Sequence, residues 1–357
     1  MFSTSFGAPI MSVPGEMPAV GDGALEDVRT CILCLKEGVP TYSGLRDYTF
    51  GTGGVWDYRE CTSCGLLWLS PRPVRRDIGK YYATYLTHKA KSDHSSSRKF
   101  YDKFKLALWA RTLRQPALAP DWRWAQIARI ARLDPFVRQI GRMGTMYLDG
   151  VRPGRLLDVG CGNGSFLALM QSAGWEVVGT EPDLKAAKLA SERLRVPIHT
   201  QEVCKIAFEP SSFDAVTLHH VIEHVHDPVA LIADCRRVLK PGGRLVMITP
   251  NLWGSGHRWF DADWRGLEPP RHLHVFSPHA LTAAAERAGI RVDLLETSPR
   301  SAPGNWIESR VISRRRVGAP EKQSSLLAAL AFLVWQRASK VLRPETGAEL
   351  VLVGTVG

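Results

Sequence analysis

The feature that most constrains this chain is a short apolar segment that runs directly into three closely spaced glycines. Residues 155–159 read Arg-Leu-Leu-Asp-Val, and residues 160–164 read Gly-Cys-Gly-Asn-Gly. A strand that enters a glycine loop and then a helix brings backbone close to a ligand at the amino end of that helix. The dinucleotide-binding fingerprint needs its third small residue one position later, where Ser165 stands, so residues 158–164 match a different loop. The loop predicts a ligand site, but by itself it does not say which ligand.

Strand-like and helix-like segments alternate from residue 155 onward. Strands are expected at 155–159, 176–180, near Ile198, 213–218 and 244–249, and helices at 166–172, 183–195 and 228–239. Further along, Ser277 is a suitable N-cap for a helix that extends through Arg287, and strands follow at 290–295 and 350–353. This order predicts an α/β fold with a doubly wound, mostly parallel, Rossmann-like sheet of seven strands. In such sheets, ligands bind beyond the carboxyl ends of the strands.

The chain has 357 residues, which is too long for one small domain. Residues 1–28 are rich in glycine, proline, serine and alanine, and we expect a disordered tail there. A cysteine-containing module at 29–71 and a basic helical linker at 72–150 precede a catalytic domain at 151–357. Helices are expected in the linker at 99–114 and 122–142, interrupted by prolines. The catalytic domain carries an insertion at 299–345 with three consecutive arginines, Arg314–Arg316, and an apolar helix at 326–342.

Four of the seven cysteines form two C-x-x-C pairs, Cys31/Cys34 and Cys61/Cys64. Two tight turns of this kind can place four thiolates around one tetrahedral zinc ion, and Gly65 supplies the permissive backbone that such a turn needs. A closed site with four sulfur ligands has no open position, so we expect a zinc ribbon with structural zinc. The alternatives are two unrelated thiol pairs and, with less support, a thioredoxin-like motif without its βαβ context. Cys161, Cys204 and Cys235 are expected to be small buried residues.

The formal net charge of the chain is +11. The positive charge is concentrated at residues 72–150 and 299–345. A basic surface favours acidic partners such as nucleic acid, anionic lipid or phosphorylated substrates, although a merely solvated face is an equal alternative. The first 30 residues lack the pattern of a signal peptide, and no apolar run reaches the length of a membrane span. We therefore expect a cytoplasmic protein with possible peripheral contact to an anionic membrane.

Four motifs in order resemble those of class I S-adenosylmethionine-dependent methyltransferases. They are the glycine loop at 156–166, the acidic stretch Gly179-Thr-Glu-Pro182, the stretch from Ser212 to Pro228, and Leu239-Lys-Pro-Gly-Gly-Arg-Leu245. Residues 218–224, Leu-His-His-Val-Ile-Glu-His, are similar to the subgroup with ubiquinone-pathway O-methyltransferases. The resemblance implies that Gly160, Gly162 and Gly164 approach S-adenosylmethionine, that Glu181 binds its ribose, and that Glu202 and Val203 border the adenine. Residues 201–204 depart from the pattern of many relatives at that border. The same motifs bring in Asp158, Pro182 and His219 as further cofactor-site candidates.

Methyl transfer to a hydroxyl group requires a proton acceptor, and histidine is the usual general base near neutral pH. The candidates are His272 and His274 after the fifth strand, and His220 and His224 after the fourth. We expect both loops to open over the donor methyl group. For each histidine, the alternative is a hydrogen bond to backbone, and a metal site at His272, His274 and Glu268 lacks a matching set of ligands. Arg271 is a candidate for binding an acidic group of the substrate.

The sequence therefore favours a methyltransferase that acts on a small-molecule, glycan or lipid-linked acceptor, at oxygen. One alternative is an RNA-modifying methyltransferase that holds RNA with its ribbon and basic linker. The motif typical of base N-methylation is absent, since Thr249-Pro-Asn251 lacks its aromatic residue. The other alternative is a non-catalytic scaffold that binds S-adenosylmethionine, which the intact glycine loop disfavours.

Overall fold

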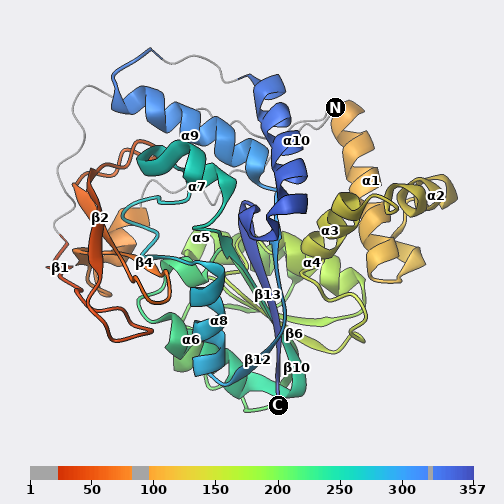
Figure 1. Ribbon diagram of the computed structural model, residues 1–357. Helices are drawn as coiled ribbons and strands as arrows, with labels where there is room; N and C mark the ends of the chain where they lie inside the picture. The colour runs from red at the N-terminus through yellow and green to blue at the C-terminus, as the bar shows by residue number, and fades with distance from the viewer. Residues whose placement is uncertain (1–22, 83–95, 321–324) are drawn as a thin grey trace.

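The centre of the computed structural model is a seven-stranded sheet covered by helices on both faces (Figure 1). The structure describes residues 23–82, 96–320 and 325–357. The strand order is β12-β13-β10-β9-β6-β7-β8, in which only β13 runs antiparallel to its neighbours. The strands are β6 (Arg155–Val159), β7 (Glu176–Thr180), β8 (Ile198–His199), β9 (Phe213–His219), β10 (Leu239–Pro250), β12 (Ile290–Ser298) and β13 (Glu349–Val356). The predicted doubly wound, mostly parallel sheet is confirmed.

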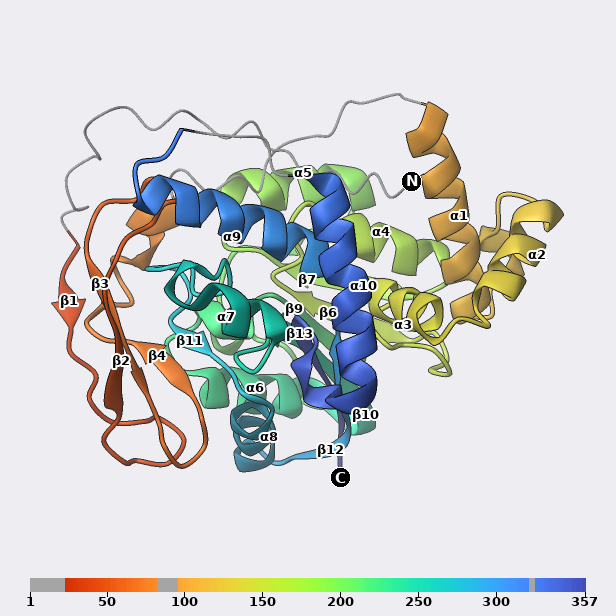
Figure 2. The same cartoon turned by 45° about the horizontal axis from the view of Figure 1, so that its top comes forward.

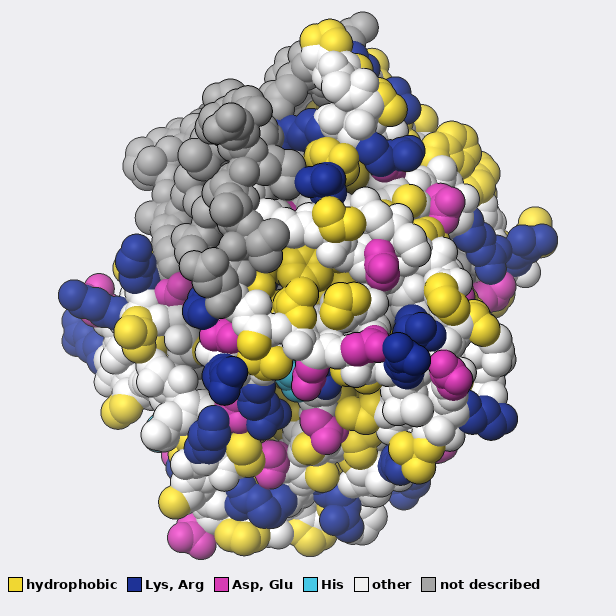
Figure 3. All heavy atoms as spheres, turned by 90° about the vertical axis from the view of Figure 1, so that its left-hand side faces the viewer, with side chains coloured by type: hydrophobic (Ala, Val, Ile, Leu, Met, Phe, Trp, Pro, Cys, Tyr) yellow, Lys and Arg dark blue, Asp and Glu magenta, His cyan; other side chains and the backbone are white. Residues whose placement is uncertain are grey.

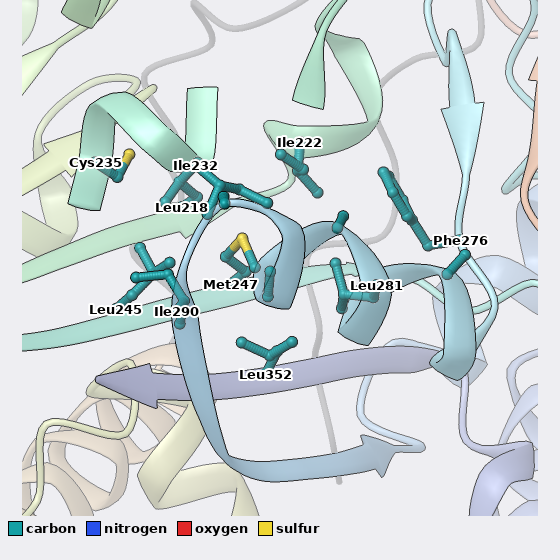
Figure 4. Close-up of a cluster of buried hydrophobic side chains, with 14 of the residues drawn as sticks. Leu218, Ile222, Ile232, Cys235, Leu245, Met247, Phe276, Leu281, Ile290 and Leu352 are labelled. Carbon is teal, nitrogen blue, oxygen red and sulfur yellow. The ribbon is translucent and has the colours of Figure 1, made fainter. Parts of the chain in front are cut away.

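Alternate side chains of the central strands pack into different layers because successive residues of a strand point to opposite faces. Leu218, Met247 and Leu352 lie on the face covered by α6 (Pro228–Val238) and α8 (Pro278–Arg287), as Figure 4 shows. Val246 and Val351, which neighbour them in the sequence, belong to the cluster on the other face. That face is covered by α3 (Pro135–Gly144), α4 (Ser165–Ser172) and α5 (Leu184–Leu194). The carboxyl ends of the parallel strands remain as one edge where side chains from several strands meet.

The linker is helical as expected, but the first helix lies two to three residues earlier than predicted, and the stretch predicted as one helix at 122–142 forms two helices that are divided before Pro135. α1 (Ser96–Thr112), α2 (Trp122–Ala131) and α3 form a group at one end of the molecule (Figure 2). Asp121 and Asp134 cap α2 and α3 by accepting hydrogen bonds from backbone amides of their first turns. Two further helices, α9 (Ala302–Arg316) and α10 (Leu326–Leu342), occupy the predicted insertion between β12 and β13, and the short α7 (Ser255–Phe260) lies beside them. None of the described helices has both the length and the apolar character needed to cross a membrane.

The N-terminal module at residues 29–71, called the ribbon below, contributes to a second sheet with the order β11-β4-β3-β2. β2 (Val39–Leu45), β3 (Trp56–Glu60) and β4 (Leu67–Leu69) come from the N-terminal module, but β11 (His274–Val275) comes from the segment after β10. His274 pairs with Trp68, and Val275 pairs with Leu67. The ribbon sheet is therefore completed by the catalytic domain.

Two expectations about the N-terminal part and the single cysteines need correction. The proposed tail falls mainly outside the described residues, but Leu25–Glu26 forms β1, which pairs with β5 (Arg72–Pro73). Cys161 and Cys235 are buried as expected, whereas Cys204 is exposed in the short turn after β8.

Seen from the side of the ribbon, the surface shows cationic and anionic side chains intermingled rather than a field of one sign (Figure 3).

Candidate functional site

The glycine loop after β6 has the backbone that its sequence requires. Gly160, Gly162 and Gly164 all have positive φ, at +71°, +55° and +72°, a region that favours glycine. A Cβ atom at Gly162 would meet nothing within 4 Å, so the loop has open space over its middle glycine. A Cβ atom at Gly160 would instead lie 2.5 Å from Val221, which follows β9. The loop is thus packed against the neighbouring strand end and open above Gly162.

Carboxylates lie beside and beneath this loop. Glu181, directly after β7, accepts hydrogen bonds from the Gly162 amide at 2.9 Å and the Asp183 amide at 3.0 Å. Asp158, at the end of β6, is buried and accepts a hydrogen bond from the Thr217 hydroxyl at 2.6 Å. Burial raises the pKa of Asp158 to about 7, although that hydrogen bond opposes the shift. Pro182 is exposed next to Glu181.

The residues proposed to border an adenine differ from each other in their surroundings. Val203 is buried in the core beneath the sheet edge, whereas Glu202 is exposed and lies 3.3 Å from Lys205. The structure thus places an apolar side chain below this border and a paired charge at the surface.

A cluster of titratable side chains occupies the same edge of the sheet, from the end of β9, which is next to the glycine-loop strand β6, to the start of β13, two strands further on. His219 lies opposite Ile248 of β10, and Glu349 lies opposite Pro250 on the other side of β10. His220 bridges two carboxylates: its Nδ1 is 3.0 Å from Glu223 Oε1, and its Nε2 is 3.1 Å from Glu349 Oε1. His220 has φ = +55°, a conformation that residues other than glycine rarely adopt and that is concentrated at functional sites.

The bridge fixes the charges of this cluster. Burial opposes the charged imidazole of His220, but its bonds to Glu223 and Glu349 outweigh burial and raise its pKa to about 10. Burial likewise opposes the charge of Glu223, yet the His220 bond lowers the Glu223 pKa to about 2. Burial lowers the pKa of His219 to about 3, so His219 is neutral at pH 7. Near neutral pH, a positive His220 therefore lies between two negative carboxylates.

Two buried polar atoms of this cluster have no hydrogen-bond partner among the described residues. They are Nε2 of His219 and Oε2 of Glu349. A buried polar atom without a partner costs free energy, and such atoms in a native protein often belong to a functional site. His219 ends β9 and Glu349 begins β13, with β10 between them, and one ligand atom from each of His219, His220 and Glu349 lies within 4.8 Å of the other two.

The other predicted histidines lie between the catalytic domain and the ribbon. His272 is buried, its Nδ1 is 2.7 Å from the Gly266 carbonyl oxygen, and burial lowers its pKa to about 4. His274 is part of β11, and burial lowers its pKa to about 3. The expectation that these two residues lie in an open loop is wrong, because β11 pairs with the ribbon. His224 is partly buried and contacts the Tyr82 hydroxyl at 2.9 Å.

Arg271 does not face a substrate site as expected. Its guanidinium is fully buried and donates to Asp47 of the ribbon at 2.8 Å and to Glu268 at 3.0 Å. It also lies over the Phe50 ring, at 4.4 Å from the ring centroid. Arg271 is a structural link between the two domains.

The four paired cysteines converge as predicted. Their sulfur atoms all lie within 4.8 Å of one another, and Cys31 Sγ is 3.7 Å from Cys64 Sγ. The two turns have matching hydrogen bonds, since Leu35 N donates to the Cys31 carbonyl and Gly65 N donates to the Cys61 carbonyl, each at 2.8 Å. Leu35 and Gly65 also share positive φ values of +57° and +67°.

Sequence reasoning missed Glu349 and the residue that positions it. Glu349 begins a strand whose next four residues are apolar, which is an unusual place for a carboxylate and the only local signal of its role. Asn251 is fully buried and donates from its side-chain amide to the carbonyls of Glu345 and Gly347, each at 2.7 Å. Asn251 thus fixes the chain just before it enters β13.

A family model described as a methyltransferase domain matches residues 109–295, which is more than half of the chain. The chain belongs to this methyltransferase family. Its fold is that of class I methyltransferases, and its cofactor is S-adenosylmethionine.

Among curated proteins it is similar to two ubiquinone biosynthesis O-methyltransferases. The one from Xanthomonas campestris pv. campestris (strain B100) is 44% identical over 103 residues, which are 27% of this chain and 43% of the relative. The one from Xanthomonas euvesicatoria pv. vesicatoria (strain 85-10) is 43% identical over 151 residues, 39% of this chain and 63% of the relative. The chain thus matches less than two thirds of the length of these relatives.

Solved structures with a likeness to this methyltransferase include a geranyl diphosphate C-methyltransferase from Streptomyces coelicolor A3(2). It has 15% identity and a TM-score of 0.45, and the match covers 79% of this chain and 97% of that chain. A possible histamine N-methyltransferase from Thermotoga maritima has 19% identity and a TM-score of 0.42, with coverage of 70% and 99%.

The glycine loop of this methyltransferase fits the cofactor on its own geometry. The open space at Gly162 admits a ligand against the backbone, and the adjacent Glu181 carboxylate can accept hydrogen bonds from ribose hydroxyls. The amino end of α4 follows directly and favours the carboxylate end of an amino acid moiety.

Proposed function

We propose that this methyltransferase transfers the methyl group of S-adenosylmethionine to a hydroxyl oxygen, with Glu349 as the proton acceptor and His220 holding Glu349 in place. The proposal is carried by the buried pair of unpartnered atoms, His219 Nε2 and Glu349 Oε2, at the edge of the sheet that also carries the glycine loop. The curated relatives are named O-methyltransferases, which supports oxygen as the acceptor atom.

The cofactor, when bound, supplies an electrophilic methyl group on a positively charged sulfur. The protein has to bind the acceptor hydroxyl, orient it and accept its proton. As the new oxygen–carbon bond forms, the carbon–sulfur bond breaks and its electron pair remains on sulfur. The hydroxyl proton passes to Glu349 Oε2, so that a neutral ether and a neutral thioether leave the site.

A carboxylate of low pKa suffices as the base in this step. Hydrogen bonding to His220, together with the nearby charge of Arg300, lowers the pKa of Glu349 in spite of its burial. The hydroxyl becomes strongly acidic as its oxygen is methylated, so the proton moves late and downhill. His219, which is neutral, offers Nε2 to orient the acceptor hydroxyl. This assignment replaces a histidine base with a carboxylate that a histidine positions.

The test is methyl transfer from labelled donor to a panel of phenols, catechols and other hydroxyl compounds. Glu349→Gln keeps the shape of the side chain but removes the base, and kcat/KM should fall by about 100- to 10,000-fold. Donor affinity, measured by calorimetry, should remain unchanged in this variant. Glu181→Ala serves as the converse control, because it removes a cofactor contact and not the base. It should weaken donor binding by about 2–3 kcal/mol.

Two results would contradict the proposal. One is full activity of Glu349→Gln on a hydroxyl acceptor. The other is wild-type transfer to amine or carbon acceptors with none to hydroxyl compounds.

We also propose that Cys31, Cys34, Cys61 and Cys64 hold one structural zinc ion. Sulfur ligands of a tetrahedral zinc lie about 3.8 Å apart, given Zn–S bonds of about 2.3 Å. The Cys31–Cys64 separation of 3.7 Å supports this spacing. All four ligand positions would be filled by protein, so the ion would hold the ribbon together and take no part in methyl transfer.

A further inference from the structure

Helix α10 carries an apolar face that the other described residues of the chain leave uncovered. Its inner side chains, among them Phe332 and Leu333, are buried against the protein. The opposite face consists of Leu327, Ala331, Val334, Ala338 and Val341, with Leu342 beside them, all exposed or partly exposed. The four large residues of this outer face are 65–86% exposed. α10 lies near the upper edge of the molecule in Figure 1 and in front of the central sheet in Figure 2.

The charged residues of α10 are engaged with the protein rather than displayed on this face. Arg337 binds Asp134 at 2.8 Å, and Lys340 contacts the Thr297 carbonyl oxygen. No other charged residue occurs between Leu326 and Leu342. A helix of 17 residues extends about 25 Å, so the uncharged face runs along the surface for about that distance.

Cations appear where this face ends. A hollow of 360 Å³ between α7 and α10 has two tryptophans, a leucine and two arginines among its lining residues, namely Trp259, Trp335, Leu342, Arg258 and Arg343. The two tryptophan rings lie 5.8 Å apart, and Trp259 is largely exposed. Arg258 and Arg343 are also exposed. Tryptophan and arginine beside an apolar helix face form the arrangement of a helix that lies in a membrane interface.

Two arginines of the α9 triplet are engaged with the protein. Arg315 donates to the Tyr48 carbonyl oxygen at 2.6 Å, and Arg316 pairs with Asp263 at 2.6 Å. Both therefore tie α9 to other parts of the protein. The cations that line the hollow beside this face are instead Arg258 and Arg343.

We propose that the outer face of α10 docks onto the surface of an anionic lipid bilayer, with Arg258 and Arg343 at the level of the headgroups. The charge of the molecule favours this occupant over a second copy of the chain. A symmetric dimer through this face would bring the same two arginines, and two chains of formal charge +11, toward each other. An anionic bilayer attracts those charges and accepts the apolar face. This inference is independent of the acceptor and of the proposed function.

The test is co-sedimentation of the full chain with vesicles of phosphatidylcholine that contain phosphatidylserine, compared with phosphatidylcholine alone. The wild type should bind the anionic vesicles more tightly. Val334→Asp/Val341→Asp should abolish binding to both kinds of vesicle. Val55→Asp, which adds a charge at an exposed apolar position of the ribbon, should bind as the wild type does.

The cations are tested separately. Each cation should contribute about fivefold to the affinity for anionic vesicles. Arg258→Gln/Arg343→Gln should therefore weaken this binding by about 25-fold. Arg76→Gln/Arg152→Gln, which removes two exposed cations elsewhere, should have little effect. Unchanged donor binding in every variant will show that the fold is intact.

Three outcomes would overturn the inference. The wild type fails to bind anionic vesicles, or Val334→Asp/Val341→Asp binds them normally. Alternatively, sedimentation velocity shows a wild-type dimer that this variant abolishes, which would make the face an interface between copies. Loss of hydroxyl methylation in Glu349→Gln has no bearing on these results, so the two proposals can fail separately.

Discussion

The charge of His220 is set by two carboxylates that reach it from different parts of the chain. Glu223 follows three residues later, whereas Glu349 arrives from the last strand. The Thr249 hydroxyl in turn donates to Glu223 at 3.0 Å and fixes the far side of the bridge. A histidine in this position acts through its positive charge and orientation, because both ring nitrogens are already occupied.

This bridge predicts a pH dependence of stability. The pKa of His220 rises from about 6.5 in the unfolded chain to about 10 in the folded protein. Its contribution to the free energy of unfolding is therefore complete below about pH 6.5 and is lost as pH rises through about 10. Denaturant unfolding between pH 6 and 10 should show a stability gap between wild type and His220→Gln that shrinks with rising pH.

The control for this measurement is His279→Gln, which alters an exposed histidine on α8 and should leave the profile unchanged. Direct titration of the His220 ring by NMR should give the raised pKa. A midpoint near 6.5 would contradict the bridge.

Sequence reasoning identified the histidines of the site but could not separate them. His220, His224, His272 and His274 all follow strands of the sheet, and their local sequences look alike. Their differences arise from partners distant in the sequence: Glu349 meets His220, and the ribbon buries His272 and His274. Local patterns contain no information about such partners.

At the level of elements, the glycine loop and the cysteine turns were predictable because their geometry is encoded within a few residues. Both cysteine turns repeat one hydrogen-bond pattern, and the second uses glycine where the first uses Leu35 at positive φ. The two-residue strand β11 was not predictable, since it has no pattern of its own and exists only because β4 lies next to it.

The cysteine turns predict one zinc ion per chain, measured by elemental analysis of protein purified without chelators. Cys61→Ser/Cys64→Ser should lose the metal and destabilise the ribbon, because binding of structural zinc is coupled to folding. Cys204→Ser is the matched control, as this exposed thiol lies outside the cluster. Metal-free wild-type protein, or full occupancy in the double variant, would refute the zinc site.

At the scale of the whole molecule, the ribbon and the catalytic domain share their interior. Cys31, Cys61 and Trp68 belong to the same buried cluster as Met247 and Leu352 of the central sheet. The Tyr58 hydroxyl donates to the His272 carbonyl oxygen at 2.8 Å, and Arg271 joins Asp47 to Glu268. The domain boundary near residue 71 is therefore clear in the sequence, but in the structure one continuous hydrophobic core spans it.

This shared interior predicts that both parts unfold together. Arg271→Met leaves two buried carboxylates without their common partner and should cost about 3–5 kcal/mol, the usual cost of breaking a buried ion pair. Circular dichroism and tryptophan fluorescence should report one coincident transition. Arg152→Met, at an exposed position, should stay within about 0.5 kcal/mol of wild type. Two separate transitions in the wild type would contradict the shared interior.

The pairing of β4 with β11 also has a consequence for synthesis of the chain. Ser277, which donates to the Cys64 carbonyl oxygen just beyond β11, is 213 residues away from Cys64. At about 5–20 residues per second, a ribosome needs on the order of 10–40 s to make that stretch. During this time the nascent ribbon has all four thiols but neither its last strand nor its packing partners. A metal ion captured at that stage would hold the ribbon in shape until the partner that covers it has been made.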